Sequence, residues 1–251
     1  MDTKCLFSVA SAVGLSISML MSGQASASPF PWRVAQNSNA LLAQQSSGAR
    51  TIGFVPPADE GAPRYTRGGA TRDDCNALQV LPESVSGWTG EARPMVVAYF
   101  KRDVQQVLLK VEAVDGSESY IYADDELFAI EGEGLAEIPM PNSLGELTEN
   151  KLYVWSMVLL CKDKPLGPNS IVVKGGVKRV APVLNAVDAE AMSWDEKAAA
   201  YAETGLWYDL VSTLVSTKAA FPDDAEVEQA WESVWTSVGL DEAFEQFTSE
   251  E

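Results

Sequence analysis

The chain has 251 residues, of which 36 are acidic, 18 are basic and none is histidine, so its formal net charge is -18. A chain this acidic repels nucleic acid, and we expect no nucleic-acid partner. The absence of histidine excludes His-based triads, His-ligated zinc and histidine general bases. The sequence also has no phosphate-binding loop, dinucleotide fingerprint or Gly-x-Ser-x-Gly motif. We therefore predict no cofactor and a protein that is not an enzyme.

The N-terminus has the pattern of a secretory signal peptide. An apolar run over residues 6–21 follows Lys4, and Ala25-Ser26-Ala27 supplies the small residues of a cleavage site. The run is long enough for a signal peptide but too short to cross a bilayer. We predict a signal peptide over residues 1–27, cleaved after Ala27, and a secreted or periplasmic protein without stable membrane insertion. The alternative is a retained N-terminal anchor.

Residues 28–50 are rich in Ser, Gln, Asn and Ala, and this composition predicts a flexible leader. Order is expected to begin near Thr51. The loop that follows carries Arg64, Arg67 and Arg72 in an otherwise acidic chain. These three cations are a candidate surface for a carboxylate or an acidic partner. The alternative is that they pair with the chain's own acids.

The middle of the chain predicts a β-sandwich domain over residues 51–182. Apolar and polar residues mostly alternate over 107–113, which is typical of a half-buried strand. Gly175-Gly176 fits a hairpin turn or a bulge. Short strands with no helices between them favour an antiparallel sandwich of immunoglobulin-like architecture. The other expected strands are 95–100, 120–122, 127–130, 135–140, 152–160, 171–173 and 177–180.

Once the signal peptide is removed, Cys75 and Cys161 are the two remaining cysteines. In an oxidising compartment two such cysteines most simply form a disulfide. The closed loop would stabilise the fold by about 4–5 kcal/mol on the chain-entropy model, less any strain. The alternative is a pair of redox-active thiols, but the sequence has no Cys-x-x-Cys spacing and no histidine.

The spacing of apolar residues changes from strand-like to helical after about residue 186. Residues 183–247 therefore predict a helical region docked on the sandwich. Ser193 and Glu196 form a capping box for a first helix, which Gly205 ends. Further helices are expected over 207–220, from Asp223 or Asp224 to Gly239, and over 241–247. The first two helices resemble a tetratricopeptide unit, with matching residues at Trp194, Ala198, Tyr201, Leu210, Leu214 and Pro222.

Trp207, Tyr208 and Asp209 open the second of these helices and form a second candidate interaction surface. If the two aromatic side chains are exposed, they are natural anchors for a protein partner. If they are buried, they form core between the helices and the sandwich, which is the more common outcome for large aromatic residues.

Two acidic groups, Asp124-Asp125-Glu126 and Glu131-Gly132-Glu133, lie next to expected strands. Paired carboxylates can catalyse glycoside hydrolysis, so a carboxylate-dependent hydrolase of envelope polysaccharide is one alternative function. A calcium-dependent adhesive module is another, although the sequence lacks an Asp-x-Asp-x-Asp-Gly loop. Solvated turns explain these acids adequately, and we predict no metal ligands.

Two motifs resemble a secreted, mainly cyanobacterial family, the domain of unknown function 928. The first runs from Phe54-Val55-Pro56-Pro57 to Cys75, and the second includes Gly205-Leu206-Trp207-Tyr208-Asp209 and Ser237-Val238-Gly239-Leu240. Asp73-Asp74 departs from the family, in which a Gly usually follows Arg72. The resemblance implies an exported protein and assigns no catalytic residue. We expect a non-enzymatic protein-interaction or secretion-associated module with a protein partner in the cell envelope.

Overall fold

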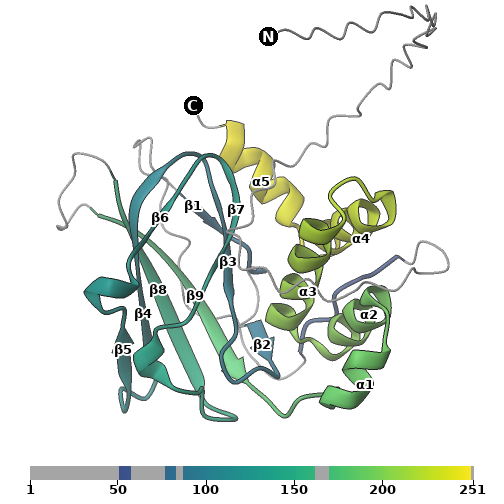
Figure 1. Ribbon diagram of the computed structural model, residues 1–251, viewed down its shortest axis with the longest axis horizontal. Helices are drawn as coiled ribbons and strands as arrows, with labels where there is room; N and C mark the ends of the chain where they lie inside the picture. The colour runs from purple at the N-terminus through teal and green to yellow at the C-terminus, as the bar shows by residue number, and fades with distance from the viewer. Residues whose placement is uncertain (1–50, 58–76, 83–86, 162–169, 250–251) are drawn as a thin grey trace, which may run out of the picture.

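The computed structural model describes residues 51–57, 77–82, 87–161 and 170–249. Within these residues, nine strands and five α-helices form the α+β fold that the sequence predicts (Figure 1). The expected signal peptide and leader lie outside this part of the chain, as do Arg64, Arg67, Arg72 and Cys75. Cys161 is described and buried. Because Cys75 lies outside the described residues, the Cys75–Cys161 disulfide stays a prediction.

The larger sheet has six strands in the order β2-β9-β8-β4-β5, and β6 also pairs with β4. All of these pairs are antiparallel except β2 with β9, which is parallel. The expectation of a purely antiparallel sandwich is therefore wrong at this edge. Only strands joined by a tight hairpin must be antiparallel, and in the sequence β2 is separated from β9 by strands β3 to β8. The strands are β2 Gly87–Thr89, β4 Val104–Ala113, β5 Ser119–Ile121, β6 Phe128–Ile130, β8 Leu152–Leu160 and β9 Ile171–Arg179.

The smaller sheet is antiparallel and consists of β1 (Ala77–Gln79), β3 (Val96–Phe100) and β7 (Gly134–Ile138), with β3 in the centre. Every residue of β3 is buried. Residues of both sheets and of helices α2 to α5 belong to one hydrophobic core. The helices lie on the side of the molecule away from β4 and β8 (Figure 1). The immunoglobulin-like architecture stays a prediction.

Gly175 and Gly176 lie inside a continuous strand, because β9 runs from Ile171 to Arg179 without interruption. The expectation of a turn or bulge here is wrong. Gly175 is opposite Trp155 of β8, and a Cβ at position 175 would overlap the Trp155 indole ring. The glycine therefore makes room for a buried aromatic side chain, and the need for this space is tertiary rather than local.

The helices begin and end close to the expected residues. Ser193 and Glu196 form the capping box of α2, and Gly205 ends this helix in the left-handed conformation. Asp224 caps α4 by accepting hydrogen bonds from two backbone amides. Helix α1, capped by Asn185, was not expected. The tetratricopeptide likeness stays a prediction. The helices are α1 Ala186–Ala191, α2 Trp194–Thr204, α3 Trp207–Ala220, α4 Ala225–Ser237 and α5 Leu240–Ser249.

Candidate functional site

The three residues that open α3 are core residues. Trp207 is 1% exposed, Tyr208 4% and Asp209 8%. The Trp207 indole Nε1 donates a hydrogen bond of 2.8 Å to the carbonyl oxygen of Val80, and its ring packs edge-on against Phe54. The interpretation of these residues as an interaction surface is therefore wrong. The two aromatic rings are packed, and their polar atoms are hydrogen-bonded, at the junction between α3 and the sheets.

Tyr208 connects α3 to the larger sheet through a buried chain of hydrogen bonds. The Trp155 Nε1 donates to the Tyr208 hydroxyl at 2.7 Å, and this hydroxyl donates to the Gly176 carbonyl oxygen at 2.9 Å. Gly87 leaves room for the Tyr208 ring, because a Cβ there would overlap it. The aromatic and glycine positions are thus parts of one packing arrangement that holds the helix on the sheet.

Asp209 is a buried carboxylate at the same junction. Both of its carboxylate oxygens accept hydrogen bonds from the Gly90 backbone N–H, at 3.3 and 3.2 Å, and Thr89 also hydrogen-bonds to it. Burial nevertheless disfavours the charged form and raises the pKa of Asp209 to about 6. The group therefore takes up a proton at a higher pH than an ordinary aspartate does.

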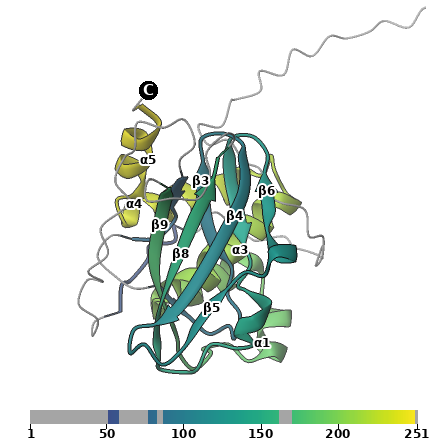
Figure 2. The ribbon, with the colours of Figure 1, turned by 90° about the vertical axis from the view of Figure 1, so that its left-hand side faces the viewer.

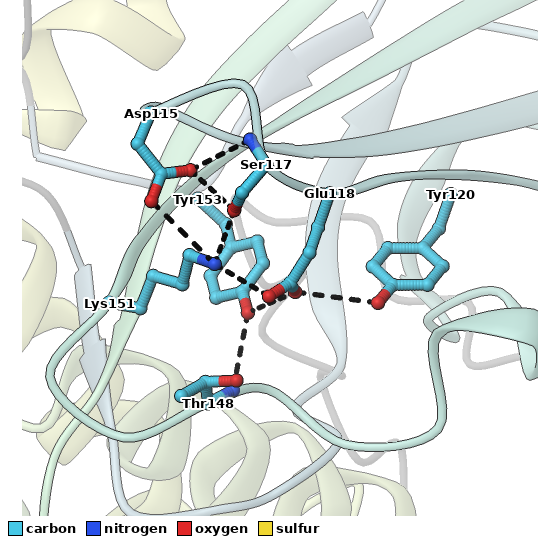
Figure 3. Close-up of polar contacts among 7 residues, drawn as sticks. All are labelled: Asp115, Ser117, Glu118, Tyr120, Thr148, Lys151 and Tyr153. Carbon is cyan, nitrogen blue, oxygen red and sulfur yellow. Dashed lines mark hydrogen bonds and ion pairs between the residues drawn. The ribbon is translucent and has the colours of Figure 1, made fainter.

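A cluster of polar side chains joins the hairpin between β4 and β5 to the start of β8 (Figure 3). The Lys151 Nζ lies 2.5 Å from Glu118 Oε1 and donates to Ser117 Oγ at 2.5 Å. The Tyr153 hydroxyl donates to Glu118 Oε2 at 2.7 Å, and the Tyr120 hydroxyl approaches the same oxygen at 3.4 Å. The sequence does not reveal this cluster, because Lys151 and Tyr153 lie more than 30 positions from Ser117 and Glu118.

The charges of this cluster are mutually stabilised. The hydrogen bond from Lys151 lowers the pKa of Glu118, and the bond to Glu118 raises the pKa of Lys151. A lysine held in its ammonium form is a poor nucleophile or base at neutral pH, because only the free amine has a reactive lone pair. This arrangement is suited to fixing the β4–β5 hairpin against β8.

One carboxylate from each of the two acidic groups is hydrogen-bonded within the fold. Asp124–Glu126 form a single 3₁₀ turn, and Glu126 accepts hydrogen bonds from the backbone amides of Ala123 and Asn142, each at 2.6 Å. Glu133 accepts a short hydrogen bond from the Tyr99 hydroxyl. Across the described ranges, no three or more Cys, Asp or Glu side chains are grouped so that they could hold a metal ion.

The outer face of the larger sheet points away from the helices (Figure 2). The partly exposed positions of its strand β8 are apolar except Ser156. In the register, Val158 of β8 lies between Leu108 of β4 and Val172 of β9. Opposed residues on neighbouring strands have Cβ atoms about 4.5–5.5 Å apart, so these three residues form one row, here called the apolar row. All three are partly exposed. The partly exposed side chains of β8 itself are Leu152, Val154, Ser156, Val158 and Leu160.

A second row, here called the lysine row, lies beside the apolar row. It consists of Lys110, Ser156 and Lys174, because Ser156 is opposite both lysines in the register. Lys178 lies on the same face, with its Nζ 5.4 Å from the centre of the Trp88 ring. Among the outward residues of β4, β8 and β9, Glu112 is the one carboxylate, and its Oε1 lies 2.8 Å from the Lys110 Nζ.

The sequence contains one signal for this face, which lies in strand β8. The run Leu152–Leu160 is apolar at every position except Ser156. A strand with one face in water usually alternates, whereas a nearly continuous apolar run is typical of a strand covered on both faces. The position of the lysines opposite Ser156 could not be read, because it depends on the register between strands.

The sequence model of a family described as Domain of Unknown Function (DUF928) matches residues 61–248. The chain belongs to the DUF928 family. The resemblance seen in the sequence motifs is thus confirmed at the level of the family. No curated protein matches this DUF928 chain.

One solved structure similar to the DUF928 chain is the fn3 domain of the human collagen alpha-1(XX) chain. The two are 13% identical with a TM-score of 0.26, and the match covers 49% of this chain and 94% of that one. A likeness this slight carries no argument about fold or function. In the described part of the chain, no helix has the length and apolar character needed to cross a membrane.

Proposed function

We propose that this DUF928 protein is an exported, non-enzymatic protein that binds another protein of the cell envelope through the outer face of its larger sheet. The supporting observation is the apolar row of Leu108, Val158 and Val172, which is partly exposed on the face away from the helices. Contiguous apolar surface on a folded protein marks a site of interaction. Neither the hydrolase nor the calcium-dependent module has a comparable observation in its favour.

Capture from envelope extract tests this proposal. The purified chain is compared with a variant carrying Leu108→Gln and Val158→Gln, and with a control variant carrying Val183→Gln and Phe221→Gln. Val183 and Phe221 are 42% and 36% exposed and lie outside the sheet, so the control removes two apolar side chains elsewhere. We expect one protein to be captured by the wild type and the control and to be lost by the sheet variant.

All three proteins must first show the same cooperative unfolding transition, so that loss of capture cannot be ascribed to misfolding. If wild type and sheet variant capture the same proteins, or if neither captures any, the proposed function is wrong.

Export is the second part of the proposal, and it rests on the sequence pattern of residues 1–27. Protein recovered from the periplasm or the medium should begin at Ser28, as measured by intact mass. Recovery of a chain that retains the signal sequence would contradict cleavage after Ala27. Non-reducing peptide mapping of the same material should yield a peptide that links Cys75 to Cys161, since an oxidising compartment favours their pairing. Recovery of both residues as thiols would contradict the disulfide.

A further inference from the structure

We propose that the outer sheet face takes a partner segment that is both apolar and acidic. Apolar side chains of the partner cover Leu108, Val158 and Val172, and a carboxylate of the partner pairs with the exposed Lys174. This inference rests on the proposed function and adds the chemistry of the partner, which the binding face itself specifies through its two rows.

The outer face of the larger sheet is more basic than the chain as a whole. The whole chain has a net charge of -18. Its outer sheet face departs from this average, because the outward residues of β4, β8 and β9 include three lysines and one glutamate. Lys174 is exposed, and Lys110 is partly exposed with its side chain beside Glu112. A positive patch on an acidic protein attracts a negatively charged surface and repels a positive one.

The apolar row and the lysine row lie side by side on the sheet. Positions two residues apart on a strand are separated by about 6.6–6.8 Å. The apolar and lysine rows are therefore close enough for one partner segment to cover both. The aliphatic stems of Lys110 and Lys174 can extend the apolar contact while their ammonium groups stay at its rim. Ion pairs at such a rim select the partner and orient it, and the buried apolar contact supplies most of the affinity.

The same observations argue against two other occupants. In a face-to-face dimer of this chain, the lysine rows of the two copies would be brought together at one interface, and like charges there are unfavourable. An anionic bilayer would attract the lysine row but would repel the remainder of a chain with a charge of -18. A protein segment that is apolar and locally acidic can cover the face without repulsion between lysine rows and without repulsion between a bilayer and the acidic chain.

The test uses two synthetic helical peptides that share a leucine face, one flanked by glutamates and the other by lysines. Binding to the full chain is measured by fluorescence anisotropy. We expect the acidic peptide to bind more tightly, and Lys174→Glu to weaken its binding by about fivefold to tenfold, since one attraction becomes a repulsion. Lys197→Glu on α2 changes the net charge equally and is the matched control, with an expected change of less than about twofold. Raising the salt concentration should also weaken the acidic peptide selectively.

Several outcomes would overturn the inference. These are equal binding of the two peptides, no binding of either, or equal effects of Lys174→Glu and Lys197→Glu. Binding to phosphatidylglycerol vesicles without binding of the acidic peptide would favour the membrane instead. Dimerisation in sedimentation experiments that Val158→Gln abolishes would favour a second copy. If capture from envelope extract depends on Leu108 and Val158 while the peptides show no preference, the proposed function stands and only the acidic character of the partner is wrong.

Discussion

Replacing Asp209 with asparagine should make the stability of the protein less dependent on pH. The carboxyl group has a folded-state pKa of about 6, against an ordinary value of 3.8, because burial disfavours its charge. The folded chain thus holds this proton more tightly than the unfolded chain does. The group's contribution to stability is fully present below about pH 4 and is lost as the pH rises through 6. The change from 3.8 to about 6 corresponds to about 3 kcal/mol in total, of which about half falls between pH 5 and pH 8.

The assay is urea denaturation followed by tryptophan fluorescence at several pH values from 5 to 8. The informative quantity is the free energy of unfolding of Asp209→Asn minus that of the wild type, because the contributions of all other titrating groups cancel. This difference should rise by about 1–2 kcal/mol over the range. Glu203→Gln, on the exposed side of α2, should change the stability by less than about 0.5 kcal/mol. A difference for Asp209→Asn that stays flat or falls would refute the reasoning about its burial.

Three further substitutions test the packing that places α3 on the sheets, each by urea denaturation at one pH. Tyr208→Phe should cost about 1–3 kcal/mol, because the Trp155 Nε1 loses its acceptor. Tyr120→Phe removes a hydroxyl at a partly exposed position, 3.4 Å from Glu118 Oε2, and should cost less than about 0.5 kcal/mol. Gly175→Ala should cost about 1–3 kcal/mol through overlap with Trp155, and an unchanged stability would mean that the indole can move aside. Asp224→Ala should cost about 1 kcal/mol by removing the cap of α4, and a neutral effect would contradict the role of the cap.

Local signals in the sequence identified most elements. Strand β8 and helix α3 have the bounds expected from their patterns, since a long apolar run and a helix between Gly205 and Pro222 are determined by neighbouring residues. Gly175 of β9 was misinterpreted because the residue that requires a glycine there, Trp155, lies on another strand. Strand β2, which is only three residues long, gave no periodic signal.

The candidate sites were predicted less well than the fold, for a related reason. Trp207-Tyr208-Asp209 left both an exposed surface and a core open, although a core is the more common outcome for large aromatic residues, and burial depends on what packs against them. Here Val80 and Phe54 complete the pocket of Trp207. The Lys151–Glu118 pair and the lysine row are both formed across strands, so they exist only once the register is known.

The outward residues of β8 separate what folding requires from what binding requires. Tyr153, Trp155, Met157 and Leu159 point inward and are almost fully buried, so they account for the strand's place in the core. Folding does not require apolar residues at the outward positions of β8, because threonine and other polar residues that favour strands are tolerated on a solvated face. Val154 and Val158 are nevertheless apolar. Their presence is explained if this face is covered by a partner, which is why substitutions at the apolar row should reduce binding far more than they reduce stability.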